Sequence, residues 1–191
     1  THRYKRGIFH RDVLLPVSTY LKAEKMCKGE YDLVYPYGFG TQENQVKWQK
    51  KVFASDELVS DFLNQNFDFS IFENHSQKDR AQWGHAQFFK RTSYIEGGME
   101  NENFKAWGPE DEEKHYRFPK LGYNIGRIID WVYHLEHSRG DDSERTNIYF
   151  HDNLKLMEDI RSLSEEELKN YYKVIHNTNA RKNLFETALF K

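Results

Sequence analysis

The sequence predicts a mixed α/β fold that ends in a helical tail. Strand-like and helix-like segments alternate in the first part of the chain, and helical patterns follow one another near its end. The chain has 191 residues, enough for one domain with a sizeable core or two small ones. Aromatic residues make up 16% of it, and each buries a large area. We therefore expect a packed α/β domain followed by helices.

In the first part of the chain, proline, glycine and serine residues mark where elements begin and end. RGIFH, just before Asp12, predicts a short buried strand, and residues 31–37 predict another. Pro16 and Gly29 bracket a helix over residues 17–28. Its expected inner positions are Tyr20, Leu21, Ala23 and Met26. Ser55 is expected to cap a second helix, whose apolar stripe is Leu58, Val59, Phe62 and Leu63.

The middle and the end of the chain predict more strands and then helices. Residues 66–82 are polar and irregular and predict a mobile loop, before a strand over residues 86–91 and a short helix to Gly98. A helix from Pro109 is expected to end before Pro119, because proline disrupts a helix interior. Residues 124–135 predict one or two strands, and residues 138–147 predict a loop. In the tail we expect two helices, the second opened by a capping box at Ser164.

Composition excludes several classes of protein. The net charge of −2 gives no basic excess for a nucleic-acid partner. Cys27 is the single cysteine, which excludes an internal disulfide framework and fits a reducing compartment. No apolar run has membrane-spanning length and no signal peptide is recognisable, so we expect a cytoplasmic protein, with peripheral membrane association as an alternative. The chain begins without a start methionine, so we expect a fragment of a longer protein.

The first candidate site is the sequence His10-Arg11-Asp12 at the end of a predicted strand. Ligands of open α/β sheets bind at the carboxyl ends of strands. His10 and Asp12 alternate with Arg11 and so point to the same side, where an imidazole and a carboxylate could hold a divalent metal. The structural alternative is that Asp12 caps the following turn and His10 is a half-buried polar residue.

The second candidate site is HLEH, from His134 to His137. Its spacing brings two imidazoles together on a helix, but VYHLEH reads as a strand that runs into a loop. The rings then converge only if the chain bends between them. One hydrogen-bonded histidine and one surface histidine, with Glu136 in solvent, remain the alternative.

The third candidate site is the stretch FKAWGPEDEEKHYRF. Pro109 suits a first helical position, and the acids after it interact favourably with the helix dipole. Glu110 and Lys114, like Glu113 and Arg117, have the spacing of helical ion pairs. Helix capping explains the acids but not Trp107, so a carboxylate that accepts a proton from a sugar hydroxyl beside an aromatic wall is equally open.

Together the three sites resemble one enzyme family. The matching blocks run in chain order to about Arg139, and they are IFHRDVLLP, GHAQFFKRTSYIEGG, ENFKAWGPEDEEKHYRFPKLGYNIGR and VYHLEHSR. They resemble glycosyltransferases of the GT-A fold, most closely the galactosyltransferase C-terminal type of β-1,4-galactosyltransferases and bacterial chondroitin-polymerase-like enzymes. The resemblance implies a Rossmann-like mixed sheet flanked by helices, and it adds little beyond Gly140.

The resemblance assigns a role to each candidate residue. Asp12 matches the second aspartate of the family's Asp-x-Asp motif, a direct metal ligand, and His10 replaces the first, on the donor side. His134 and His137 match the later metal ligands by spacing, so the three would bind one Mn²⁺ or Mg²⁺. Trp107 matches a mobile tryptophan that closes over donor and acceptor. Glu110 and Asp111 match the pair that holds the acceptor sugar, and Asp111 falls at the position of the catalytic base.

The implied activity is transfer of galactose or an N-acetylhexosamine from a nucleotide-diphospho-sugar, typically a UDP-sugar, to a glycan acceptor. Inversion at the anomeric carbon and a role in surface polysaccharide synthesis would follow. Only about nine residues precede the His10-Arg11-Asp12 strand, where the family has a nucleotide-binding half. We therefore expect an N-terminally truncated GT-A domain over residues 1–140 and a helical extension over residues 141–191. The main alternative is a non-catalytic glycan-binding or interaction module, and a metal-dependent hydrolase matches no motif.

Overall fold

The computed structural model describes residues 6–9, 12–38, 49–79, 82–138, 140, 143 and 145–175. For residues 6–9 only the backbone is described. The chain divides into two units, one formed by Thr1–Lys90 with Ile125–Ser138 and the other by Arg91–Asn124 with Arg139–Lys191. Each unit therefore combines segments that are far apart in the sequence.

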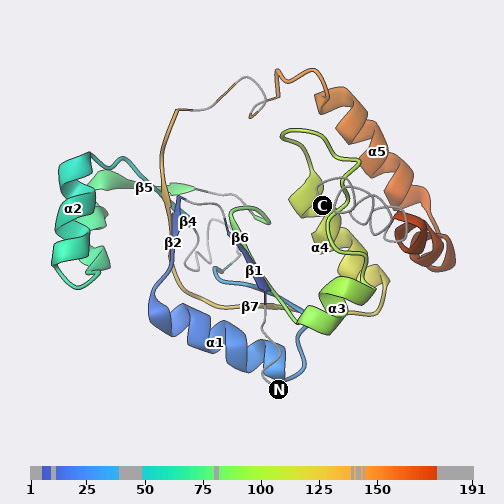
Figure 1. The fold of residues 1–191 in the computed structure, drawn as a ribbon, viewed down its shortest axis with the longest axis horizontal. Coiled ribbons are helices and arrows are strands. Elements are labelled where there is room, and N and C mark those ends of the chain that lie inside the picture. Colours follow the sequence, from blue (N-terminus) through green and yellow to red (C-terminus); the bar gives the residue numbers. More distant parts are fainter. Residues whose placement is uncertain are drawn as a thin grey trace, which may run out of the picture. The chain divides into compact units, whose positions relative to one another are not determined.

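The first unit holds a four-stranded mixed sheet packed against one helix (Figure 1). Its strands, in spatial order, are β1 (Arg6–Phe9), β6 (Ala86–Phe89), β3 (Leu33–Tyr35) and β7 (Ile125–Arg127). The first two pairings are antiparallel, and β3 pairs with β7 in parallel. Helix α1 (Val17–Lys28) buries Ala23 and Cys27 against Val34 and Ile128 of this layer.

A second mixed sheet in the same unit carries His134 on one of its strands. Its order is β2 (Val13–Leu14), β8 (Val132–Leu135), β4 (Gln49–Val52) and β5 (Ser76–Asp79), and only β8 and β4 pair in parallel. Helix α2 (Asp56–Asn64) and the 3₁₀ helix η1 (Phe69–His75) pack on it through Phe62 and Phe72, which meet Val52 and Tyr133.

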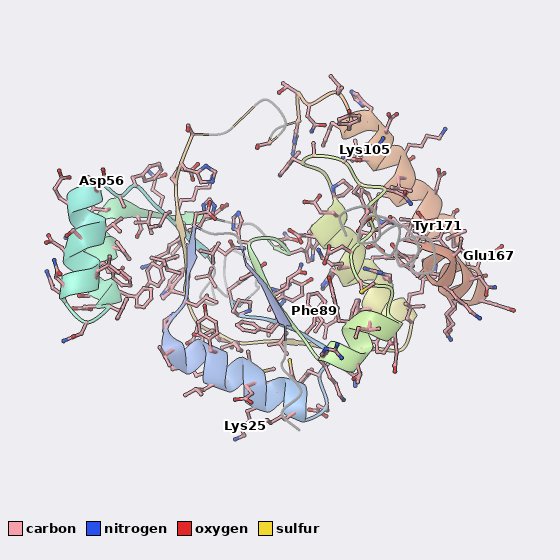
Figure 2. All side chains as sticks on the ribbon, viewed as in Figure 1. Lys25, Asp56, Phe89, Lys105, Glu167 and Tyr171 are labelled. Atoms are coloured by element: carbon pink, nitrogen blue, oxygen red, sulfur yellow. The ribbon has the colours of Figure 1, made fainter. Side chains whose placement is uncertain are left out.

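The second unit is helical where it is described. It contains α3 (Arg91–Glu96), α4 (Glu110–Lys120), α5 (Phe150–Ser162) and a helical stretch over residues 165–175 (Figure 1). Ile160, Leu168 and Tyr172 form its apolar core. Ser164 and Glu167 make the two reciprocal hydrogen bonds of the predicted capping box, at 2.8 and 3.3 Å. Glu167 and Tyr171 are labelled on this stretch in Figure 2.

The predicted end of the helix at Pro119 is wrong, since α4 continues to Lys120. Its real stop is Gly122, whose φ of +84° lies in the left-handed region that favours glycine. The amides of Gly122 and Tyr123 donate to the carbonyls of Pro119 and Phe118 at 3.0 and 2.9 Å, the pattern of a Schellman motif. Pro119 lies in the last turn, so its missing N–H removes only one helical hydrogen bond.

Two other expectations are also corrected. Residues 66–82 are not an irregular loop throughout, because η1 and β5 lie within them and Phe72 is fully buried. On α1 the face is rotated from the expected one, so that Thr19, Ala23 and Cys27 are buried while Tyr20 and Leu21 are exposed. In both places tertiary packing selects a different apolar set from the one that the local pattern favours.

The protein is thus a mixed α/β fold with two mixed sheets flanked by helices. The separate elements predicted within residues 124–135 are confirmed as two strands. A functional boundary at residue 140 stays a prediction; by compactness, residues 91–124 group with residues 139–191.

Candidate functional site

The first and second candidate sites of the sequence meet in the first unit, where β2 begins and β8 ends. Val13 pairs with His134 across the antiparallel strands, and the amide of Leu135 donates to the carbonyl of Asp12 at 2.8 Å. This register places Asp12 opposite the end of β8. His137 follows three residues after His134, where the chain has left the strand. The bend that the sequence requires for convergence of the two rings is therefore present.

Asp12, His134 and His137 form a cluster that could hold one metal ion. The Oδ2 atom of Asp12 lies 3.1 Å from Nε2 of His134 and 2.6 Å from Nε2 of His137. Ligand atoms bound about 2.0–2.2 Å from one ion lie about 3 Å apart at right angles, so small adjustments would fit one ion between them. His134 is buried, whereas His137 is half exposed and leaves one side of the cluster accessible to solvent.

A hydrogen bond sets the orientation of the His137 ring. Its Nδ1 lies 2.8 Å from the carbonyl oxygen of Ser138, which can only accept, so Nδ1 carries the proton. In the neutral ring, Nε2 then presents a lone pair toward the carboxylate of Asp12. Two electron-rich atoms at this distance require a cation between them, either a proton or a metal ion. A backbone acceptor on the far nitrogen is also the usual support of a metal-binding histidine.

His85 lies next to the cluster and was not predicted from the sequence. Its ring stacks on that of His134, with centroids 4.3 Å apart and planes 12° from parallel. The Nδ1–H of His85 donates to the side-chain carbonyl of Gln49, which is fully buried. The φ of His85 is +72°, a strained value for a residue with a side chain. His85 thus covers one face of the His134 ring. The contact joins β8 of one sheet to the residue just before β6 of the other, so no local pattern reveals it.

The chemistry of the three ligands indicates which ions fit. Two imidazoles and one carboxylate suit Mn²⁺, Fe²⁺, Co²⁺ or Zn²⁺ better than Ca²⁺ or Mg²⁺, which prefer oxygen ligands. Three protein ligands also leave coordination positions for oxygens of a ligand or water. The expected fourth participant, His10, lies outside the described residues.

The third candidate site of the sequence, the stretch that leads into α4, lies in the second unit. Lys114 is almost fully buried, and its Nζ lies 2.7 Å from Oε2 of Glu100 and 3.1 Å from Oδ1 of Asp111. The Tyr94 hydroxyl donates to the other oxygen of Glu100 at 3.2 Å. Lys114 therefore pairs with Asp111 and Glu100, where helical spacing favoured Glu110. Asp111 itself remains about one quarter exposed.

Glu110 differs from its neighbour. Burial, reinforced by the negative charge of Asp111, raises the pKa of the Glu110 carboxyl from 4.5 to about 7. Its Oε2 atom is buried and has no hydrogen-bond partner among the residues that the structure describes. The helix dipole favours the ionised form of Glu110, but desolvation by burial outweighs it and raises the pKa. The two adjacent carboxyls have different environments.

The ion pair that helical spacing predicts between Glu113 and Arg117 is confirmed, and it lies in the interior and not on the helix surface. Glu113 and Arg117 are both buried, with Oε1 and Nε 3.1 Å apart. The Tyr172 hydroxyl donates to the same Oε1 at 2.6 Å, and the Arg117 guanidinium stacks 3.8 Å from the centroid of the Tyr172 ring. Arg117 also donates to the carbonyls of Gly97 and Met99, each at 2.7 Å. This network fixes α4 to the segment that follows α3.

Trp107 lies just before α4 and keeps 37% of its surface exposed. Its ring stacks on Phe150, the first residue of α5, with centroids 5.6 Å apart and planes 17° from parallel. Trp107, Glu110 and Asp111 lie in the same unit, and a joint sugar-binding role for them stays a prediction. The metal cluster belongs to the other unit, and the expectation that Asp111 lines the cleft of the metal stays a prediction.

No protein-family model matches the chain, and a search of curated proteins found no relative. In the part of the chain that the structure describes, none of the helices combines the length and the apolar character needed to cross a membrane.

Proposed function

We propose that the protein is a metal-dependent, inverting glycosyltransferase that moves a hexose from a nucleotide-diphospho-sugar to a glycan acceptor. The observation that carries the proposal is the meeting of Asp12, His134 and His137 at one point. These residues were selected by resemblance to GT-A glycosyltransferases, and their ligand atoms lie within 4.8 Å of one another. Convergence of residues so distant in sequence is what a shared ion would require.

In this proposal Asp12, His134 and His137 hold Mn²⁺. The ion, when bound, supplies positive charge for the departing nucleoside diphosphate. His85 and Ser138 support the two imidazoles from behind, through the ring stack and the Nδ1 hydrogen bond. The half-exposed edge at His137 is the side from which diphosphate oxygens would reach the open coordination positions.

The acceptor would bind at the start of α4. Asp111 accepts the proton of the attacking hydroxyl, while Lys114 orients its carboxylate through Oδ1. Glu110 holds a second hydroxyl of the sugar through its buried Oε2, which is otherwise without a partner among the described residues. A carboxyl with a pKa near 7 can donate to one sugar oxygen or accept from another. Trp107 offers its exposed ring for stacking on the apolar face of the sugar.

A second candidate function is a glycan-binding module without transfer activity. One observation favours it: the Lys114 ammonium, which Asp111 shares with Glu100, already pairs with the Asp111 carboxylate. Such a carboxylate is well suited to hydrogen bonding and less well suited to proton abstraction. We place both candidates in the cytoplasm, which fits a chain whose single cysteine, Cys27, is buried.

Calorimetry separates the two candidates. The natural gene product and its Asp12→Asn variant are titrated with Mn²⁺ and then, in the presence of Mn²⁺, with UDP, UDP-galactose, UDP-N-acetylglucosamine and UDP-N-acetylgalactosamine. The matched control is Asp79→Asn, a partly buried carboxylate on β5.

We expect Mn²⁺-dependent UDP-sugar binding that Asp12→Asn abolishes and Asp79→Asn retains, together with sugar transfer to an oligosaccharide panel. Glycan binding without any metal-dependent nucleotide binding would establish the second candidate and refute the enzyme. Binding of neither nucleotide nor glycan would refute both.

A further inference from the structure

The segment Lys105–Gly108, which carries Trp107 into α4, is fastened to α5 by one asparagine. Asn153 is buried on α5, and both atoms of its amide contact the segment. Its Oδ1 accepts from the amide of Lys105 at 3.1 Å, and its Nδ2 donates to the carbonyl of Lys105 at 2.7 Å. The same Nδ2 lies 3.3 Å from the carbonyl oxygen of Trp107. Figure 2 shows Lys105 beside α5.

The backbone of the segment is adapted to this contact. Ala106 has a φ of +55°, in the left-handed region, which is costly for alanine and must be stabilised by its surroundings. A Cβ atom at Gly108 would lie 2.7 Å from Nδ2 and 3.0 Å from Cβ of Asn153. The absence of a side chain at Gly108 therefore permits the close approach of the segment to α5.

Three further side chains, from residues 147–150 at and just before the start of α5, contact the same segment. Asn147 donates through Nδ2 to the carbonyl of Trp107 at 2.9 Å, and its Oδ1 accepts from the amide of Tyr149. Phe150 stacks on the Trp107 ring. The Lys105 ammonium lies 5.4 Å from the centroid of the Tyr149 ring. The segment is thus held by its backbone, its aromatic ring and its charge.

Helix α5 is in turn tied to α4, the helix that follows the segment. The Tyr116 hydroxyl donates to the carbonyl of Arg161 at 2.9 Å, and Lys120 donates to the carbonyls of Arg161 and Leu163. The Arg161 guanidinium pairs with Glu112. Contacts at both ends of α5 therefore fix the position of Trp107 relative to Glu110 and Asp111, which the same α4 carries.

We propose that Asn153 is a positioning residue for Trp107, and that α5 is thereby a structural part of the sugar-binding site. The link to sugar binding rests on the proposed function, whereas the holding of Trp107 does not. The closing movement that the resemblance implies for Trp107 would break the hydrogen bonds of Asn147 and Asn153 or the stack on Phe150. The region after residue 140, to which the sequence assigns no role, then determines where the acceptor sugar stacks.

The holding of Trp107 is tested first without any substrate. Trypsin cleaves after Lys105, an exposed residue in the segment, and mass spectrometry follows the fragment that ends there. Asn153→Leu removes all the amide hydrogen bonds, and Asn153→Asp keeps the shape but replaces the Nδ2 donor with a second acceptor against two carbonyls. The control is Glu158→Ala, an exposed position on the same helix.

We expect both Asn153 variants to raise the rate of cleavage after Lys105 by about 10-fold or more, since each typical hydrogen bond that opposes local opening contributes up to about 10-fold and more than one is lost. The indole N–H resonance of Trp107, assigned by its loss in Trp107→Phe, should shift or broaden in both variants and stay unchanged in Glu158→Ala. If an Asn153 variant does not fold, Phe150→Leu tests the same point by removing only the stacked ring. Unchanged cleavage and an unchanged indole resonance would overturn the proposal.

The second measurement concerns the sugar. In full-length enzyme, Asn153→Asp should raise the KM for the glycan acceptor by about 10-fold or more, with the affinity for Mn²⁺ unchanged, since displacement of a positioned group is costly. An increase in cleavage after Lys105 with an unchanged acceptor KM would overturn the role of α5 in sugar binding. If the wild-type protein transferred no sugar, the proposed function would be refuted. The cleavage and indole measurements would still decide the role of Asn153.

Discussion

The carboxylates of the metal cluster and of the α4 start differ in what neutralises them. The Oδ2 atom of Asp12 faces the nearest nitrogens of two imidazoles, a geometry that could hold a metal ion. On α4, by contrast, Asp111 and Glu113 pair with the buried cations Lys114 and Arg117. If the first group holds a metal ion, it would suit a charged ligand, whereas the second would suit a neutral one.

This difference is consistent with a division of labour between donor and acceptor. A nucleotide-diphospho-sugar brings negative charge, and a metal ion on the cluster would balance it. A glycan acceptor brings only hydroxyls and apolar ring faces, for which hydrogen-bonding carboxyls and an aromatic ring are sufficient. The predictions below test the two sides of this comparison.

The largest effect is expected from Asp111→Asn. Loss of the proton acceptor should lower the rate of sugar transfer by about 10²–10⁴-fold and leave UDP-sugar binding intact. Glu102→Gln is the control, because it removes an exposed carboxylate from the same unit. Initial rates and calorimetry on the same preparations measure both quantities. Equal activity in Asp111→Asn would remove Asp111 as the base.

The next effect concerns the buried charges of α4. Arg117→Met leaves Glu113 buried without its cation and removes the donors to Gly97 and Met99, so we expect the free energy of unfolding to fall by about 3–5 kcal/mol. Arg161→Met removes a partly exposed ion pair and should cost only about 0–1 kcal/mol. Urea denaturation of both variants gives the comparison. A similar fall in the free energy of unfolding for both variants would show that the buried Arg117–Glu113 pair contributes no more than the exposed pair.

On the metal side, His137→Ala should weaken Mn²⁺ binding by about 100-fold or more. Changes behind a ligand already cost about 10–100-fold, and here a ligand itself is lost. The control is His75→Ala, an exposed histidine at the end of η1 in the same unit. Calorimetry with Mn²⁺ alone measures both. An unchanged affinity in His137→Ala would separate the cluster from metal binding.

Sequence patterns were sufficient where a feature depends on neighbours along the chain. The helix over residues 17–28, the Ser55 cap and the capping box at Ser164 follow from local hydrogen bonds, and the structure confirms them. The residues of the metal cluster came instead from resemblance, because HLEH alone leaves open whether the two rings converge. Their meeting depends on the register between β2 and β8, which no local pattern fixes.

Features that depend on packing between distant segments were missed. His85, just before β6 of one sheet, stacks on His134 of β8 in the other sheet, and Asn153 contacts Trp107 from a helix more than 40 residues later in the chain. His85 lies in a block that matches the family but has no role assigned there, and Asn153 lies beyond the matching blocks. The environment of Glu110 belongs to the same class, because the helix dipole can be predicted from the sequence while the depth of burial cannot.

The smallest effect concerns Glu110. Because its pKa is raised from 4.5 in a solvated carboxyl to about 7 in the folded protein, the folded state retains a proton that the unfolded state releases. Protonation of Glu110 therefore contributes to the free energy of unfolding in full below pH 4.5, and this contribution is lost as the pH rises to about 7. Each pKa unit corresponds to about 1.4 kcal/mol, and partial exposure reduces the total to about 1–2 kcal/mol. Glu110→Gln, which cannot ionise, should not show this loss.

The measurement is the difference in the free energy of unfolding between Glu110→Gln and wild type, taken in urea at intervals from about pH 4.5 to about pH 8, a window set by linkage. We expect the difference to grow in favour of the variant with rising pH. Glu96→Gln, at an exposed position on α3, should give a flat difference. A flat difference for Glu110→Gln as well would show that Glu110 ionises like a solvated carboxyl. The start of α4 would then carry uncompensated negative charge at neutral pH, and the contrast with the metal cluster would fail at that residue.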